Sequence, residues 1–315
     1  MNEPSTSAEL TVIIVNWNTR ELTTNAVATL LENAGDVKMD VVVWDNGSSD
    51  GSADAFADQF PEVKLIRHPT NVGFAEAHNL IMPSIETEWV LLLNSDTETY
   101  PGAIASLLEF SRRHPEAGIT GGRTHFPDGS LNPTSCWNRM TIWSLFCSAT
   151  GLTRAFKGSE FFNSEGMGNW QRDSVRQVDI VTGCLFMLRR STWDELGGFL
   201  PKYFMYGEEF DMCLRAAKLG YKPMITPDAK IMHMGGASAR LPEDRLLQQA
   251  RSRASFIRDH WSAPAIPVGI ALMWLWSLVR MSAARVRTLL GKSDGEEARI
   301  WTNIWRRRRE WIRGY

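Results

Sequence analysis

The sequence has few cysteines, and their spacing excludes two classes of protein. Cys136, Cys147, Cys184 and Cys213 show neither the C-x-x-C spacing of a zinc or redox site nor the density of a secreted disulfide scaffold. We therefore expect four reduced thiols inside the core, which is the usual state of cysteine in the cytosol.

Several sequence signals that mark other classes are also missing. No apolar run is followed by G-x-G-x-x-G, and G-x-x-x-x-G-K-[ST] does not occur. The sequence therefore lacks the phosphate-binding glycines of dinucleotide-binding and P-loop folds. There is no internal repeat and no low-complexity segment. The first residues, MNEPSTSAEL, have no basic start and no apolar run, so we expect no secretory signal there.

The net charge of −2 conceals an asymmetry along the chain. The 315 residues suffice for one large α/β domain with an extension, or for two ordinary domains. Residues 280–315 contain ten Lys or Arg against four Asp or Glu, so the rest of the chain is acidic. The C-terminal tail is thus chemically different from the body.

The first hundred residues alternate between two periodicities. Short apolar runs, too short for helices, predict strands at 10–15, 40–44, 63–67 and 89–94. Helical patterns follow them at 20–33, 52–59, 74–85 and 101–113. Apolar strands separated by helices indicate a parallel sheet covered on both faces.

Polar residues follow three of these strands, at the edge where such sheets bind ligands. Asn16 ends the first strand, "DNGSSDGS" at 45–52 follows the second, and "NSD" at 94–96 follows the fourth. Asp45 can accept the ring N–H of a pyrimidine base, although Asp-Asn-Gly also suits a turn before a helix cap. "NSD" can hold Mg²⁺ or Mn²⁺ beside a diphosphate, although N-x-D alone more often caps a helix.

The second half is less regular. Residues 125–175 suggest an insertion or a long loop, and 178–190 a buried strand or strand pair. Helices are predicted at 191–199 and 208–220, each ending at glycine. "HMGGAS" at 233–238 ends a further apolar run, where a lone histidine is more often structural than a ligand.

Seven motifs in order resemble family 2 glycosyltransferases, particularly the rhamnosyltransferase-like subgroup. They are "TVIIVNWN", "WDNGSSDGS", "NVGFAEAHN", "LLLNSDTE", "VTGCLFMLRRSTWDELGGF", "FMYGEEFDMCLR" and "HMGGAS", and they span about residues 10–240. The resemblance implies an α/β GT-A fold with a mostly parallel sheet, a nucleotide-sugar donor, and inverting transfer that depends on a divalent cation.

The resemblance also implies roles for individual residues. Asp45 would bind the donor's base, with Asn16 and Gly73 lining the same pocket. Asn94 and Asp96 would occupy the position of the D-x-D-like motif, near the diphosphate of the donor sugar. Asp96 would bind the metal there, and His233 would be a further ligand.

Inversion requires a base on the face of the sugar opposite the leaving diphosphate. In the family this base is usually the Asp of an E-D pair, and here that position is Glu209, preceded by Glu208. Glu209 is the predicted base, Glu208 could replace it, or activity is lost. Asp211 pairs with Arg215 at i, i+4, which suits support of the helix surface.

The tail carries an uncharged stretch at 261–279, followed by arginines and tryptophans. Pro264 and Pro267 are expected to limit its helix to 268–279, too short to span a bilayer. Six of the thirteen tryptophans follow residue 260, and Trp mixed with Arg suits a helix on an anionic membrane surface. Packing on the catalytic domain or a homo-oligomer interface are the alternatives, whereas nucleic-acid binding is not expected.

We therefore predict a glycosyltransferase domain at 8–240, with a nucleotide-sugar half at 8–97 and an acceptor half at 98–240, and a helical membrane-associating extension at 241–315. The predicted activity is rhamnosyl transfer from dTDP-rhamnose to a lipid-linked or polysaccharide acceptor of the cell envelope, by a cytoplasmic, peripheral membrane enzyme. The rivals are a catalytically inactive scaffold that retained the fold and, less favoured, a nucleotidyltransferase.

Overall fold

The computed structural model describes residues 8–235 and 242–315, which form two compact units. We call residues 8–137, 171–204 and 208–235 the N-terminal unit. The C-terminal unit comprises residues 138–170, 205–207 and 242–315.

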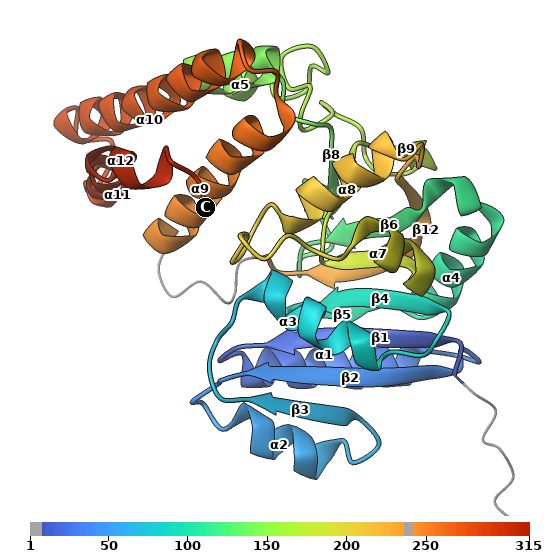
Figure 1. The fold of residues 1–315 in the computed structure, drawn as a ribbon. Helices are drawn as coiled ribbons and strands as arrows, with labels where there is room; N and C mark the ends of the chain where they lie inside the picture. The colour runs from blue at the N-terminus through green and yellow to red at the C-terminus, as the bar shows by residue number, and fades with distance from the viewer. Residues whose placement is uncertain (1–7, 236–241) are drawn as a thin grey trace, which may run out of the picture. The chain divides into compact units, whose positions relative to one another are not determined.

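Four parallel strands at the start of the N-terminal unit confirm the predicted alternation. They are β1 (Leu10–Asn16), β2 (Met39–Asn46), β3 (Lys64–His68) and β4 (Trp89–Asn94), in the order β3-β2-β1-β4. The helices between them are α1 (Arg20–Asn33), α2 (Ser52–Gln59) and α3 (Phe74–Ile81). α1 and α3 cover opposite faces of this sheet (Figure 1). α3 is shorter than predicted because Pro83 lies in a 3₁₀ turn at Met82–Ser84, where the α-helical hydrogen bonds cannot continue.

The sheet continues with mixed strand directions. β11 (Leu185–Arg189) runs antiparallel between β4 and β6 (Ile119–His125), and β12 (Met224–His233) runs parallel to β6. β5 (Thr97–Thr99) pairs antiparallel with β12 at the sheet's end. β7 (Leu131–Asn132) pairs with β6, and β9 (Arg176–Gln177) pairs with β12. β8 (Cys136–Trp137) and β10 (Ile180–Val181) form a separate antiparallel pair. The remaining helices of this unit are α4 (Ala103–Arg113), α7 (Arg190–Leu196) and α8 (Glu208–Lys218).

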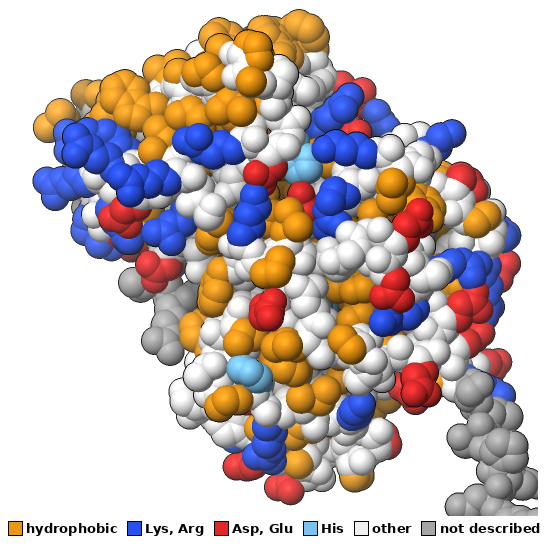
Figure 2. Space-filling model, in the orientation of Figure 1, with side chains coloured by type: hydrophobic (Ala, Val, Ile, Leu, Met, Phe, Trp, Pro, Cys, Tyr) orange, Lys and Arg blue, Asp and Glu red, His pale blue; other side chains and the backbone are white. Residues whose placement is uncertain are grey.

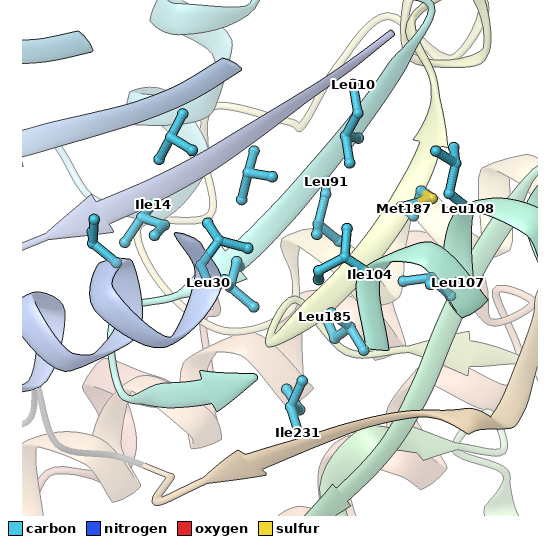
Figure 3. Packing of buried hydrophobic residues seen from close by; sticks show 14 of the residues in the cluster. Leu10, Ile14, Leu30, Leu91, Ile104, Leu107, Leu108, Leu185, Met187 and Ile231 are labelled. Carbon is cyan, nitrogen blue, oxygen red and sulfur yellow. The ribbon is translucent and has the colours of Figure 1, made fainter. Parts of the chain in front are cut away.

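Aliphatic side chains between the sheet and its helices form the core of this unit. Ile14 of β1, Leu30 of α1 and Leu107 of α4 belong to one buried cluster with Leu91 of β4 (Figure 3). The predicted reduced thiols are confirmed, since all four cysteines are free and buried. This core holds the carboxyl ends of the parallel strands at one edge.

The C-terminal unit is helical. Its helices are α5 (Ile142–Thr150), α6 (Leu152–Ala155), α9 (Pro242–His260), α10 (Ala265–Leu289), α11 (Glu296–Arg306) and α12 (Arg308–Trp311). Residues 125–175 were predicted to be an insertion or a long loop, and the long-loop alternative was wrong for α5, which begins with a capping box between Thr141 and Ser144 and packs against α10. Residues 138–170 belong to the C-terminal unit, which agrees with the insertion alternative.

The predicted limit on the tail helix was also wrong. α10 has 25 residues, because Pro264 is its N-cap and Pro267 lies in its first turn, where backbone N–H groups have no intrahelical acceptor. Among the described residues it is the one helix long and apolar enough to cross a membrane, with a mean hydropathy of 1.5 in its most apolar window.

Candidate active site

Asn16 and Asp45 meet at the carboxyl edge of the sheet. Asn16 is the last residue of β1 and Asp45 the last but one of β2, and the two are register partners, so their side chains lie next to each other. The Asn16 amide donates hydrogen bonds of 2.8 Å to Asp45 Oδ1 and 2.9 Å to Ser48 Oγ, while Asp45 Oδ2 accepts one from the Ser48 backbone N–H at 3.2 Å. The parallel register therefore brings together Asn16 and Asp45, as expected from their positions at the carboxyl ends of neighbouring strands.

The orientation of the Asn16 amide is determined by its other end. Its Oδ1 accepts hydrogen bonds from the hydroxyls of Thr19 and Thr23, at 2.9 and 2.8 Å. Asn16 is fully buried and Asp45 almost so. Asn16 thus acts in this structure as the support that orients the Asp45 carboxylate.

A loop beside this pair depends on Asn46, which the sequence reasoning missed. The Asn46 side chain donates to Asn71 Oδ1 at 3.0 Å and to the Gly73 carbonyl at 3.2 Å, and it accepts from the Val72 N–H at 3.0 Å. A polar residue directly after Asp45 at a buried strand end was the available signal. Asn46 therefore holds residues 71–73 against β2.

Gly73 lies where this loop meets the segment before the acidic helix. Its φ is +89°, and a Cβ there would lie 2.8 Å from Phe204 Cδ2 and still closer to the Phe204 carbonyl oxygen. The next residue, Phe74, donates its N–H to that carbonyl at 2.9 Å. Glycine is thus required for close backbone approach as well as for its left-handed conformation.

The predicted metal ligands Asp96 and His233 lie beside Asn94, which was predicted to bind the nucleotide sugar. His233 Nε2 is 3.3 Å from Asp96 Oδ1 and 3.3 Å from the Asn94 amide, and Asp96 Oδ2 accepts the Gly235 N–H at 3.0 Å. Burial lowers the pKa of His233, but the Cys184 sulfur and the Asp96 carboxylate outweigh it and raise the pKa to about 10. Residues 236–238 of the "HMGGAS" motif lie outside the described residues.

Asp96 and His233 fit a divalent cation that takes its other ligands from the substrate. Two cis ligands at about 2.1 Å from an octahedral ion are separated by about 3 Å, close to the distance between Asp96 Oδ1 and His233 Nε2. Within the described residues no three His, Cys, Asp or Glu side chains cluster as a complete metal site. A cation here would displace the His233 proton, since imidazole ligates in its neutral form.

The acidic residues at 208–211 form the first turn of α8. Glu208, Glu209 and Asp211 are all buried, with Glu209 the most accessible at 9% exposure. Tyr206 and Gly207, directly before them, both have positive φ, which turns the chain sharply into the helix. The favourable end of the helix dipole lowers the free energy of carboxylates in this turn.

The predicted pair between Asp211 and Arg215 is confirmed, with Nε 2.7 Å from Oδ2. Its Asp211 side is buried at 2% exposure, whereas Arg215 is partly exposed at 21%, so the pair does not lie wholly on the helix surface. Arg215 also donates to the carbonyls of Leu196 and Gly198, the latter at 2.7 Å. The pair therefore ties α8 to the end of α7.

Comparison with known sequences assigns most of this unit. Residues 11–194 match the model of Glycosyl transferase family 2. An N-acetylglucosaminyl-diphospho-decaprenol L-rhamnosyltransferase of Mycobacterium tuberculosis is 27% identical over 285 residues, covering 82% of this chain and 87% of the relative. An O-antigen biosynthesis protein of Myxococcus xanthus is 24% identical over 72% of this chain, but over only 17% of its own length.

Solved structures agree on the fold. A mannosyltransferase from Pyrobaculum calidifontis, in complex with GDP-Man and Mn²⁺, superposes with a TM-score of 0.56 at 19% identity, covering 97% of this chain and 86% of that one. GalNAc-T7 with UDP, GalNAc and Mn²⁺ gives a TM-score of 0.55 at 13% identity, covering 82% and 52%. The chain therefore belongs to glycosyl transferase family 2, resembles its rhamnosyltransferases and has the GT-A fold.

Proposed function

We propose that the protein is an inverting, metal-dependent glycosyltransferase that moves rhamnose from dTDP-rhamnose to a lipid-linked acceptor in cell-envelope glycan synthesis. The observation that carries this proposal is the similarity, along most of both chains, to a rhamnosyltransferase named for a lipid-linked acceptor, N-acetylglucosaminyl-diphospho-decaprenol. The polar edge of the sheet supports it. Asn16 and Asp45 offer groups that can bind the nucleobase of the donor, and Asp96 and His233 offer groups that can hold a cation beside its diphosphate.

In this proposal Asp45 accepts the ring N–H of the donor's thymine. Asn16 orients that carboxylate through its amide hydrogen bond. Gly73 lines the same pocket and allows its loop to pack closely against Phe204. The near-complete burial of Asp45 supports a base contact, because a carboxylate hydrogen bond gains strength where water is excluded.

Asp96 and His233 would hold Mg²⁺ or Mn²⁺, and Asn94 would contact the donor beside them. The cation would neutralise charge on the departing diphosphate. Structures of two proteins with this fold contain Mn²⁺, which supports a divalent ion without choosing between the two metals. The Gly235 N–H, which hydrogen-bonds Asp96 Oδ2, keeps the carboxylate oriented.

Glu209 is the proposed base that takes the proton of the acceptor hydroxyl, with Glu208 as its neighbour or substitute. Both are at the start of α8, where the backbone turns at Tyr206 and Gly207. Glutamate has a basicity similar to that of aspartate but one more methylene, so the acceptor must bind slightly farther from the helix.

We place the enzyme on the cytosolic face of the membrane as a peripheral protein. The four free buried thiols support a reducing compartment. The proposed domains are a transferase domain at 8–240, divided at 97 into donor and acceptor halves, and a membrane-associating extension at 241–315.

The test is a donor screen with an N-acetylglucosaminyl-diphospho-polyprenol acceptor, followed by mass measurement of the product. We expect a mass gain of one deoxyhexose from dTDP-rhamnose with Mg²⁺ or Mn²⁺, and none after chelation. Transfer from UDP-sugars but not from dTDP-rhamnose would overturn the donor assignment.

Two substitutions at one position separate the enzyme from an inactive scaffold. Glu209→Gln should abolish transfer while dTDP binding persists, and Glu209→Asp should keep measurable transfer because the carboxylate remains. If the unaltered protein transfers nothing from a full donor panel yet binds nucleotide, the scaffold alternative holds instead.

A further inference from the structure

Five aromatic side chains cluster on the surface of the C-terminal unit. Trp143 of α5 lies 4.9 Å from Phe161 and 5.7 Å from Phe146 between ring centroids, and Phe162 lies 4.8 Å from Phe156. The Trp143 indole N–H donates to the Phe161 carbonyl at 2.8 Å. These ring contacts and the hydrogen bond therefore connect α5 to residues 156–162.

Four of these side chains are exposed to solvent, and Phe162 is partly buried. Phe161 is 64% exposed, Phe156 50%, and Trp143 and Phe146 37% each. Contiguous exposed apolar surface of this kind is uncommon on a soluble monomer and marks a contact with a membrane or with another protein.

α10 extends the apolar surface of the same unit. It packs against α5, and its buried face contains small or flexible residues such as Gly269, Met273 and Ser277. Val268 and Trp274 are exposed at 44% and 41%, and Leu289 at 86%. Figure 2 shows hydrophobic side chains gathered over α10 and α5.

Basic residues border this apolar surface. Arg154 and Lys157 are exposed beside the aromatic cluster, and Arg306 and Arg309 are exposed on α11 and α12. Figure 2 shows a group of Lys and Arg side chains over α11 and α12, next to the hydrophobic side chains of α10. Apolar side chains bordered by arginines match a bilayer surface with anionic headgroups.

Two tryptophans of the tail, Trp301 and Trp311, do not form this surface. Trp301 packs edge-on against Trp276 at 4.9 Å, and Trp311 is fully buried with its N–H donating to the Ile304 carbonyl at 2.9 Å. The expectation that the Trp–Arg tail itself lies in the headgroup region therefore fails for these two side chains, because they hold α11 and α12 inside the unit.

We propose that α5, residues 156–162 and the exposed face of α10 form one docking surface for an anionic lipid bilayer, with α10 in the headgroup region. The proposal deepens the proposed function, since a lipid-linked acceptor is presented at that surface. It assigns membrane contact to residues 142–162, well before the tail.

The test is flotation of the full chain with phosphatidylcholine vesicles that contain or lack phosphatidylglycerol. The double variant Phe156→Ser/Phe161→Ser should partition at least about tenfold more weakly than the unaltered chain, since each exposed ring loses its burial in lipid. The control, Leu80→Ser/Leu219→Ser, removes side chains that are 47% and 55% exposed in the N-terminal unit and should float normally. Arg306→Glu/Arg309→Glu should weaken binding only to the anionic vesicles.

Three results would overturn the proposal. The first is unchanged flotation of the Phe156→Ser/Phe161→Ser variant. The second is retention of the protein on vesicles after an alkaline carbonate wash, which would mean that α10 spans the bilayer. The third is loss of a dimer on gel filtration in that variant with no change in flotation, which would assign the surface to a second copy of the chain. Flotation uses neither donor nor acceptor, so a failed transferase assay leaves this result independent.

Discussion

The N–H of Phe74 donates a hydrogen bond of 2.9 Å to the carbonyl of Phe204. Phe74 opens α3 beside the loop that Asn46 holds, and Phe204 begins the segment that leads to Glu208 and Glu209. One backbone contact therefore joins the proposed donor-binding loop to the segment before the proposed base. Changes at this contact should affect both stability and turnover.

Gly73→Ala tests that contact. A methyl group there meets the Phe204 backbone at a left-handed φ, so we expect a loss of roughly 3 kcal/mol in the free energy of unfolding. Gly102→Ala is the control, because Gly102 also precedes a helix at φ +75° but has no neighbour within 4 Å, and it should cost about 1 kcal/mol. Urea denaturation measures both, and equal losses would contradict the close approach at Gly73.

Asn16→Ala tests the support of Asp45. It removes one hydrogen-bond donor from Asp45 and one acceptor from each of the Thr19 and Thr23 hydroxyls, so we expect a loss of about 2–4 kcal/mol and weaker dTDP binding. The double variant with Asp45→Ala should lose less than the sum of the single variants, with a coupling of about 0.5–3 kcal/mol. Strict additivity would show that the two side chains act independently.

The pH dependence of stability should depend on His78. This imidazole is buried among Phe74 and Phe199, its Nδ1 donates to the Phe74 carbonyl at 2.8 Å, and burial lowers its pKa from 6.5 to about 4. The unfolded chain therefore takes up the proton first, so its stabilising contribution is complete above about pH 6.5 and is lost as the pH falls toward 4. The total loss is roughly 3 kcal/mol.

Urea midpoints measured from pH 7.5 to pH 4 would show this loss. His78→Leu should flatten the slope, whereas His68→Gln, on the edge strand β3, should keep it. A slope that survives His78→Leu would assign it to other groups.

Asp96→Asn tests the proposed cation site without relying on turnover. In the unaltered protein Mn²⁺ together with dTDP should raise the melting temperature, since a ligand at a hundredfold excess over its Kd stabilises by about 2.7 kcal/mol. The variant loses a charged oxygen from the pair with His233 and should show little of this metal-dependent rise. Glu98→Gln on β5 is the matched control and should behave normally. A rise of full size in Asp96→Asn would exclude that carboxylate as a ligand.

Local pattern was sufficient for the first half of the fold. Short apolar runs predicted β1 to β4, and because parallel strands in register end together, Asn16 and Asp45 were predictable as neighbours. The Asp211–Arg215 pair followed from helical spacing alone. The length of α10 was predicted wrongly, because Pro264 and Pro267 were expected to shorten a helix that they in fact begin.

Contacts between distant segments were decided only by the tertiary structure. The antiparallel direction of β11, the packing of α5 on α10, and the contact of Gly73 with Phe204 each join segments whose separation carries no periodic signal. Burial likewise depends on the partner, so Trp311 lies inside the C-terminal unit although its arginine-rich neighbourhood suggested a surface position. The sequence determined which helices and strands form and which polar groups end them. The tertiary structure determined what each side chain contacts, because packing energy arises from neighbours in space and not from neighbours along the chain.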